Sequence, residues 1–142
     1  MKRKLSVTHA GQTFTRTTER TYTHVVLVKS DYAHVYAGAI KGAADVARVN
    51  YPYYIKEANP ATRQYKHSDA ELARFAEIAT MTIDQYAQYA SDKAAERVDA
   101  DLAAGAFDKF GPIGWCGRLD LARKQADQAK ARGYGEVVIV PV

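Results

Sequence analysis

Two arginines, a tyrosine and a histidine near the N-terminus form the best candidate for a binding site. They are Arg16, Arg20, Tyr22 and His24, which are separated by even numbers of residues. Alternation along one strand places such residues on the same face, with residues two positions apart separated by about 6.6–6.8 Å. Guanidinium groups donate paired hydrogen bonds that match phosphate, and aromatic rings stack on nucleobases. We therefore expect a phosphate-bearing ligand here, with Arg118 at the start of a later predicted helix as a further contact. The competing interpretation is an exposed sheet face whose threonines and arginines supply β-propensity and solubility.

A second group of aromatic and basic residues lies in the middle of the chain. Tyrosines at positions 51, 53, 54 and 65 are interleaved with lysines and an arginine. Such mixtures bind single-stranded nucleic acid or nucleotides, but tyrosine-rich loops also pack against helices and form protein interfaces. The residues that we expect at a partner-binding surface are Tyr53, Tyr54, Arg63 and, from another part of the chain, Trp115.

The evidence for catalysis is weak. The one cysteine, Cys116, excludes an internal disulfide and a cysteine-rich metal site. It would act as a nucleophile only if folding brought His24 beside it. The four histidines are scattered, and the sequence has no glycine-rich phosphate loop and no nucleophile elbow. We expect no metal, no cofactor and no catalytic residue, so enzymatic activity is disfavoured.

The net charge of +4 is unevenly distributed along the chain. Residues 1–29 contain six basic residues and one acid, whereas residues 68–104 contain three basic residues and eight acids. A basic surface attracts phosphate groups, although salt screens this attraction beyond about 8–10 Å. The opposite charges of the two segments also suit a contact within the chain or between two copies of it.

Strands are predicted near the N-terminus at residues 4–8 and 13–29. Both segments are rich in threonine, valine or other strand-forming residues, and Ala10–Gln12 supplies a turn between them. The second segment is long, and a bend is expected near Glu19–Arg20. Val25–Val28 is apolar on both faces and predicts a buried core strand.

Helices and a closing strand are predicted in the rest of the chain. A short helix is expected over residues 38–49. The C-terminal part consists of a turn-rich connector at 111–117, a helix at 118–132 and a strand at 136–140. We expect the closing strand to lie in the same sheet as Val25–Val28, because both must bury apolar side chains.

Residues 68–104 predict one very long helix. The segment opens with Ser68 and Glu71 at capping-box spacing, ends before Gly105 and contains no proline or glycine. Its length would be roughly 54 Å, far more than the radius of gyration of about 14–15 Å for a chain of this size. A restart at Ser91–Asp92 is the alternative. The alanine-rich stripe of this helix leads us to expect a homo-oligomer that forms through it.

Together these elements predict an α+β fold in a single domain over residues 1–142. The sheet is small and mostly antiparallel, formed from the N-terminal strands plus the C-terminal strand, and packed with helices. The hydrophobic content of 47% is that of a globular protein, and no apolar run is long enough for a membrane span. The basic N-terminus lacks the apolar stretch of a secretory signal, so we expect a cytoplasmic protein.

Two stretches of the sequence resemble small accessory proteins of phages and prophages. They are Arg16–Val26 and Gly114–Ala122, together with the valine-rich C-terminus. Many proteins of that kind counter host defences by binding, because they occlude an effector or sequester a nucleotide signal. The resemblance implies a non-catalytic binding protein in the host cytoplasm, whose partner is a host protein or a nucleotide ligand. It assigns no site residues.

The alternative function is sequence-nonspecific nucleic-acid binding through the basic N-terminal residues 2–29. A small enzyme is a third and more distant possibility. Salt separates the first two, since contacts with several phosphates weaken steeply between about 50 and 200 mM salt.

Overall fold

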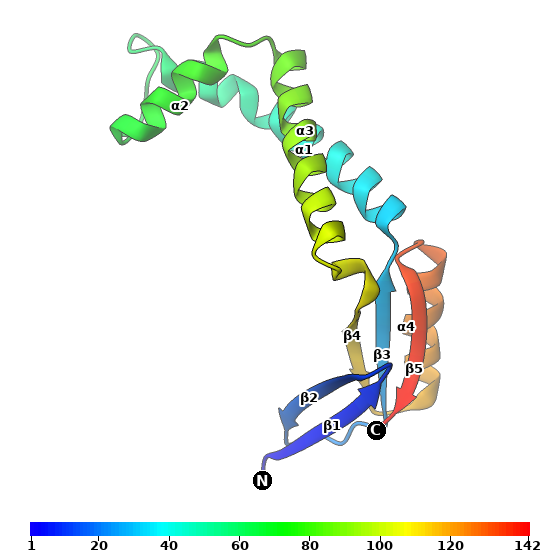
Figure 1. Cartoon of the computed structure of the whole chain (residues 1–142). Helices are drawn as coiled ribbons and strands as arrows, with labels where there is room; N and C mark the ends of the chain where they lie inside the picture. Colours follow the sequence, from blue (N-terminus) through cyan, green and yellow to red (C-terminus); the bar gives the residue numbers. More distant parts are fainter. The chain divides into compact units, whose positions relative to one another are not determined.

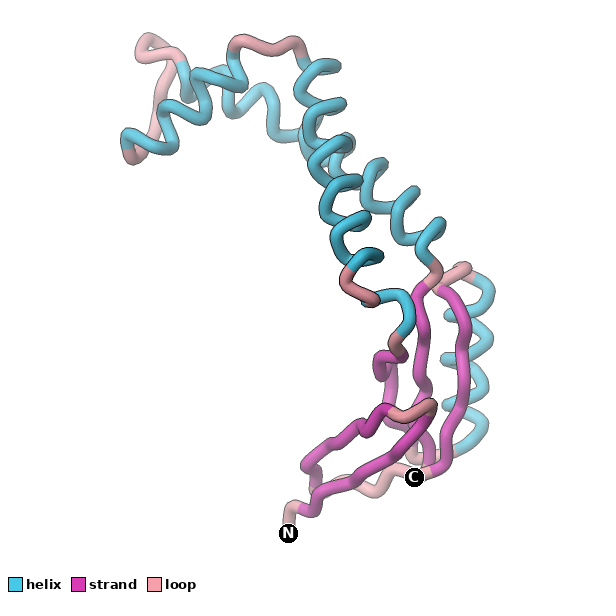
Figure 2. Tube along the Cα trace, viewed as in Figure 1, coloured by secondary structure: helices cyan, strands magenta, loops and turns pink.

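The computed structural model describes all 142 residues and confirms the α+β class. Residue contacts divide the chain into two compact units, one containing the strands and the other mostly helical (Figures 1 and 2). Unit 1 comprises Met1–Val35 and Ala100–Val142, and unit 2 comprises Tyr36–Asp99. The chain length predicts a single domain, and the structure divides it into these two units. None of its helices has both the length and the hydropathy needed to cross a membrane.

A three-stranded antiparallel sheet lies at the centre of unit 1. Its strand order is β4 (Phe110–Cys116), β3 (His24–Ser30), β5 (Gly135–Pro141). Val25–Val28 pairs with Val137–Val140, so the prediction that these segments share a sheet is confirmed. Helix α4 (Leu119–Ala131) connects the two outer strands and runs along the sheet (Figure 1).

Unit 1 is built in three layers, with a hairpin on one face of the sheet and α4 on the other. The hairpin consists of β1 (Arg3–His9) and β2 (Gln12–Thr18), joined at the predicted turn. Val7 of the hairpin packs with Leu27, whereas Val26 packs on the other face with Ala122 of α4. Successive residues of β3 therefore face different layers, which explains why both of its faces are apolar.

The prediction of one long strand over residues 13–29 is wrong. β2 ends at Thr18 and β3 begins at His24, and the two strands belong to different sheets. Thr18 Oγ1 accepts a hydrogen bond from the backbone N of Arg20 at 3.0 Å, which is a local turn that competes with strand pairing. The bend expected at Glu19–Arg20 is therefore a full break between layers.

The connector predicted at residues 111–117 is also wrong, because this segment forms β4. Pro112 is tolerated there since β4 lies at the edge of the sheet. A Cβ on Gly114 would lie 1.9 Å from Oε1 of Gln125, so this glycine permits close packing against α4 instead of a turn. The helix predicted at 118–132 and the strand at 136–140 are confirmed.

Three helices contribute to unit 2, and the first is much longer than the sequence predicted. They are α1 (Tyr32–Ala58), α2 (Asp69–Ala79) and α3 (Ile83–Ala103). The predicted helix at 38–49 stops short of Pro52, whereas α1 continues through it. Tyr51 and Tyr54 on either side of this proline pack against the buried core of Ala47, Ile78 and Tyr86. That packing favours continuation of the helix despite the hydrogen bond that proline removes.

The single helix predicted at residues 68–104 is wrong, because the chain breaks at residues 80–82 and not at Ser91–Asp92. A second capping box follows this break and caps the start of α3. Gln85 N donates to Thr82 Oγ1 at 3.1 Å, and Thr82 N donates to Gln85 Oε1 at 2.9 Å. At the predicted first cap, Glu71 N donates to Ser68 Oγ at 3.2 Å.

Half of the apolar stripe of the 68–104 segment is buried. Its buried members are Phe75, Tyr86, Ala87, Ala94 and Val98. Because the segment forms two helices, the excess length that motivated a homo-oligomer through it is absent.

Candidate binding site

One end of unit 1 brings together arginines and aromatic rings from the hairpin, the following loop and β4. The Arg16 guanidinium lies 4.8 Å from the centroid of the Tyr22 ring, and that ring lies 6.3 Å from the Trp115 ring. Arg3 donates to Thr21 Oγ1 at 3.3 Å, which places a second guanidinium beside the same loop. We call Arg3, Arg16, Arg20, Tyr22 and Trp115 the basic–aromatic end.

The positive charges of this end are not neutralised within the protein. Of the six basic residues in 1–29, only Lys29 forms an ion pair, with Glu136 at 3.3 Å. The side chains of Arg16 and Arg20 are exposed and have no carboxylate partner. Unit 1 contains 12 basic and 7 acidic residues and so carries +5, whereas unit 2 contains 8 basic and 9 acidic residues and carries −1. The positive charge of the protein is therefore concentrated in the unit that contains the basic–aromatic end.

The predicted four-residue strand face does not exist as such, because the chain breaks between β2 and β3. Arg16 and Tyr22 do come together, but through a stack of side chains and not through strand alternation. His24 is paired with Cys116, whose side chain packs on the α4 face of the sheet, while Trp115 packs on the hairpin face. Cross-strand partners point to the same face, so His24 lies on the side opposite Trp115. Its Nδ1 hydrogen-bonds with Thr23 Oγ1 at 2.8 Å.

Arg118 is the N-cap residue of α4 and already has a partner. Its Nε lies 3.2 Å from Asp120 Oδ1, and both side chains are well exposed. A Cβ on the preceding Gly117 would lie 3.2 Å from the backbone O of Thr21, so this turn packs against the 19–23 loop. An exposed pair of this kind is worth at most about 1 kcal/mol and is easily exchanged for a ligand anion.

Cys116 and His24 are neighbours in the sheet, but the thiol is unsuited to nucleophilic catalysis. Cys116 is 5% exposed, and burial raises the pKa of its thiol. Its Sγ lies 3.5 Å from Gln125 Oε1. A buried thiol with a raised pKa is poorly populated as the reactive thiolate.

The middle-chain residues predicted as a partner surface have divided roles in unit 2. Tyr54 stacks on Phe75 at 5.3 Å and is covered by Arg74, so it is a packing residue. Arg63 donates from Nε to the backbone O of Glu57 at 2.8 Å and thereby holds a loop. Tyr53 is 42% exposed and lies 6.4 Å from Tyr65, which is 60% exposed. Among these middle-chain residues, the Tyr53–Tyr65 pair thus presents aromatic surface.

Sequence reasoning missed a buried ionic cluster that anchors the loop between α1 and α2. Glu57 is completely buried and accepts hydrogen bonds from the backbone N of Gln64 and of Tyr65, both at 2.9 Å. His67 bridges two carboxylates, with Nε2 2.9 Å from Glu57 Oε1 and Nδ1 3.2 Å from Glu71 Oε2. Its four-residue spacing from Glu71 was the one available indication.

The electrostatics of this cluster favour its charged form. Hydrogen bonding to Glu57 is the main cause that raises the pKa of His67, with Glu71 adding to it. Burial alone would raise the pKa of Glu57, but its hydrogen bonds from Gln64, His67 and Tyr65 lower it overall. With its carboxylates directed at the histidine and at backbone N–H groups, the cluster is a structural anchor.

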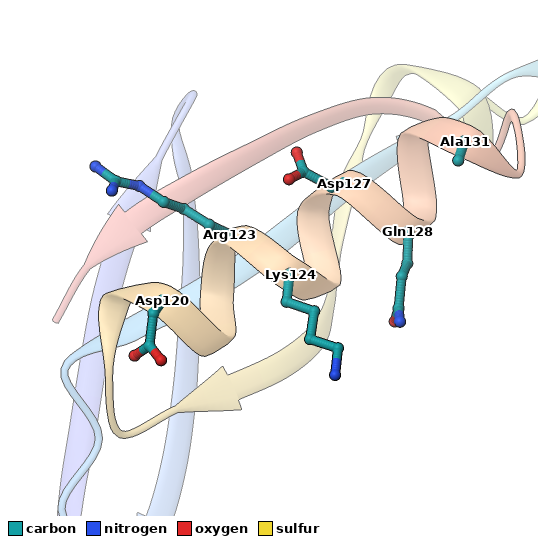
Figure 3. Close-up of a pocket in the computed structure, with 6 residues that line it drawn as sticks. All are labelled: Asp120, Arg123, Lys124, Asp127, Gln128 and Ala131. Carbon is teal, nitrogen blue, oxygen red and sulfur yellow. The ribbon is translucent and has the colours of Figure 1, made fainter.

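A shallow groove on the outer face of α4 does not form a ligand site. Figure 3 shows its lining residues, all from this one helix, with side chains that diverge from each other. They are Asp120, Arg123, Lys124, Asp127, Gln128 and Ala131. Acidic and basic side chains are mixed along it, which is the pattern of a solvated helix face. The structure also contains no group of acidic, histidine or cysteine side chains able to hold a metal ion.

No protein-family model matches the chain, and no curated protein and no solved structure is significantly similar to it.

Proposed function

We propose that this protein is a non-catalytic binding protein that antagonises a host defence factor, by occluding a protein or by sequestering a nucleotide messenger. Its ligand contacts lie at the basic–aromatic end. The observation that carries the proposal is the stack of Arg16 on Tyr22 beside Trp115, next to cations without carboxylate partners. A guanidinium grips phosphate while a neighbouring ring offers stacking surface to a base. The resemblance to phage accessory proteins supplies the context, and we place the protein in the host cytoplasm.

Nucleic-acid binding without sequence preference is the second candidate. It is favoured by the +5 charge of unit 1 and by Lys2 and Lys4, which flank Arg3 in the sequence and form no ion pair. A nucleic acid would engage these additional cations, whereas a mononucleotide has too few phosphates to do so.

Two further contacts belong to the proposal. The exposed Tyr53–Tyr65 pair in unit 2 would contact a host protein, since tyrosine is enriched at protein interfaces. Self-association through residues 68–104 stays a prediction, although half of its apolar stripe is buried. Charged residues in place of Ala79 and Ala90 would reduce an oligomer that uses this segment.

Affinity capture from host lysate tests the proposal, with mass spectrometry of both bound proteins and bound small molecules. We expect the wild type to retain a defined nucleotide or protein that the Arg16→Ala/Arg20→Ala double variant loses. The matched control is Lys93→Ala/Arg97→Ala, which removes two exposed cations from α3 in unit 2. Equal capture by the wild type and the Arg16/Arg20 variant would show that the basic–aromatic end is not the binding surface.

A further inference from the structure

The two edge strands of the unit 1 sheet differ in how well they are protected from pairing with a further strand. β4 forms one edge, and it is protected at Phe110 and Pro112. Gln12 accepts from the backbone N of Phe110 at 2.7 Å and donates to its O at 3.1 Å, so one amide side chain replaces a strand partner. Pro112 has no N–H. The pairing register also changes between Val26 and Leu27, which indicates a bulge in β4. Such features prevent further strands from pairing with β4.

β5 forms the other edge, and it has no such protection at its centre, because its one proline, Pro141, lies at the end of the strand. Val142 N donates to Thr23 O at 2.9 Å, and Asp31 N donates to Tyr134 O at 3.0 Å. These two bonds fix which residues of β5 pair with the neighbouring strand, since backbone groups alternate in an antiparallel ladder. The N–H and C=O groups of Val137 and Ile139 consequently point away from β3, and they make no hydrogen bond in the structure.

The composition of β5 makes this open edge unusual. Its centre is Val137–Val140, four consecutive β-branched residues that strongly favour an extended conformation. The only charge of the strand, Glu136, is held by Lys29 at 3.3 Å. Natural proteins normally block a free edge of this kind with charges, prolines or bulges, as β4 does here. An edge that is unblocked at its centre is the template for an added strand.

We propose that β5 pairs with β5 of a second copy of this chain, antiparallel across a two-fold axis. The two three-stranded sheets would then form one continuous six-stranded sheet. The outward N–H and C=O groups of Val137 and Ile139 would each find partners in the other copy. A two-fold axis suits this arrangement because a strand pairs antiparallel with itself using the same groups on both sides.

The charges on α4 identify the second copy as the occupant. Gln125 lies against Gly114 of β4, so the flank of α4 on the β4 side contains Gln125. Arg123 and Asp127 lie on the other flank, toward β5, and in Figure 3 they point away from Lys124 and Gln128. Both are exposed, and neither forms an ion pair within the chain.

Residues of opposite charge four positions apart are self-complementary between antiparallel helices. Pairing of β5 with its copy would bring the two α4 flanks next to each other, with the helices antiparallel. Arg123 of one copy would then face Asp127 of the other, and the reciprocal contact would form by symmetry. An unrelated extended peptide on β5 gives these two residues no such partner.

Light scattering coupled to size-exclusion chromatography at micromolar concentration tests the pairing. We expect a dimer of the wild-type chain. Val137→Pro removes one outward N–H, and Val137→Ala is its matched control, because both lose the same side-chain packing. We expect the proline variant to raise the dimer dissociation constant roughly tenfold or more over that of the alanine variant.

Exchange of the charges at Arg123 and Asp127 provides a second test, which does not depend on whether the Val137 variants fold. Arg123→Asp alone would oppose two aspartates, Asp127→Arg alone would oppose two arginines, and the double exchange would restore opposite charges. We expect about tenfold weaker dimers for each single variant and recovery for the double variant. A monomeric wild type, or single variants that dimerise like the wild type, would overturn the proposal. A dimer that is lost in Ala79→Glu, with no effect of charge exchange, would place the interface on the 68–104 segment instead.

Discussion

Removal of Arg16 and Arg20 should change how salt weakens the binding of an oligonucleotide to this protein. Three guanidiniums, those of Arg3, Arg16 and Arg20, lie at or beside the same loop, and none has a carboxylate partner. If each neutralises one phosphate of a single strand, these three guanidiniums contribute about −2 to the slope of log K against log salt, or roughly a twentyfold loss between 50 and 200 mM. The Arg16→Ala/Arg20→Ala variant retains one of the three, so this contribution should fall to about −0.7, or roughly a threefold loss.

Fluorescence anisotropy of a labelled single-stranded oligonucleotide over this salt range measures both slopes. Because both arginines are exposed, the thermal stability of the double variant should match that of the wild type. The Lys93→Ala/Arg97→Ala control should keep the wild-type slope, since these residues lie in unit 2. An unchanged slope in the Arg16/Arg20 variant would refute the assignment of phosphate contacts to these residues. If that variant unfolds, the two arginines are structural, and the interpretation as a solubilising sheet face is correct.

Two further predictions concern the scaffold. Leu27→Ala, at a completely buried position of the central strand, should lower the free energy of unfolding by about 2–5 kcal/mol in urea titrations, whereas Val49→Ala, at a 78% exposed position, should change it by less than about 0.5 kcal/mol. The raised pKa of His67 means that its stabilising contacts with Glu57 and Glu71 are complete below its unfolded pKa and are lost as the pH rises through the folded value. Thermal melts from about pH 6 to 9 should therefore show unit 2 weakening at high pH in the wild type, and His67→Gln should remove that dependence.

The strands that form the core could be predicted from the sequence because their composition leaves few alternatives. Val25–Val28 is apolar at every position, and only a strand covered on both faces accommodates such a run. The closing strand at Val137–Val140 has the same character, so their pairing followed from the need to bury both. The helix before it was visible from its basic last turn and the glycines that follow.

The errors arose where a residue with a strong local preference is used for another purpose. Gly114 and Pro112 suggested a turn, yet one permits close packing against Gln125 and the other lies at a sheet edge. Pro52 suggested a helix end, but the tyrosines beside it pack into the core on both sides. The break near Thr82 was detectable, because Thr82 and Gln85 have capping-box spacing, but an uninterrupted apolar pattern concealed it.

The candidate site was predicted in its residue types more successfully than in its geometry. Arg16 and Tyr22 do meet, but the expected alternation along one strand fails because the chain changes layers between them. Trp115 joins them through the pairing of β4 with β3, a long-range contact that no local pattern specifies. His24 was placed with them by periodicity, and the same strand break moves it to the opposite face. No pattern in the sequence indicated that Glu57 is buried, because the backbone groups that bind its carboxylate come from a loop seven and eight residues later.

Titration of Trp115 fluorescence tests the central claim most directly. Trp115 is the only tryptophan of the chain, and it lies 6.3 Å from the Tyr22 ring in the basic–aromatic end. A nucleotide or oligonucleotide that binds there should change its emission saturably in the wild type and in Lys93→Ala/Arg97→Ala, and should leave it unchanged in Arg16→Ala/Arg20→Ala. A saturable change of equal affinity in the Arg16/Arg20 variant, or no change in the folded wild type with any phosphate-bearing ligand, would contradict the account.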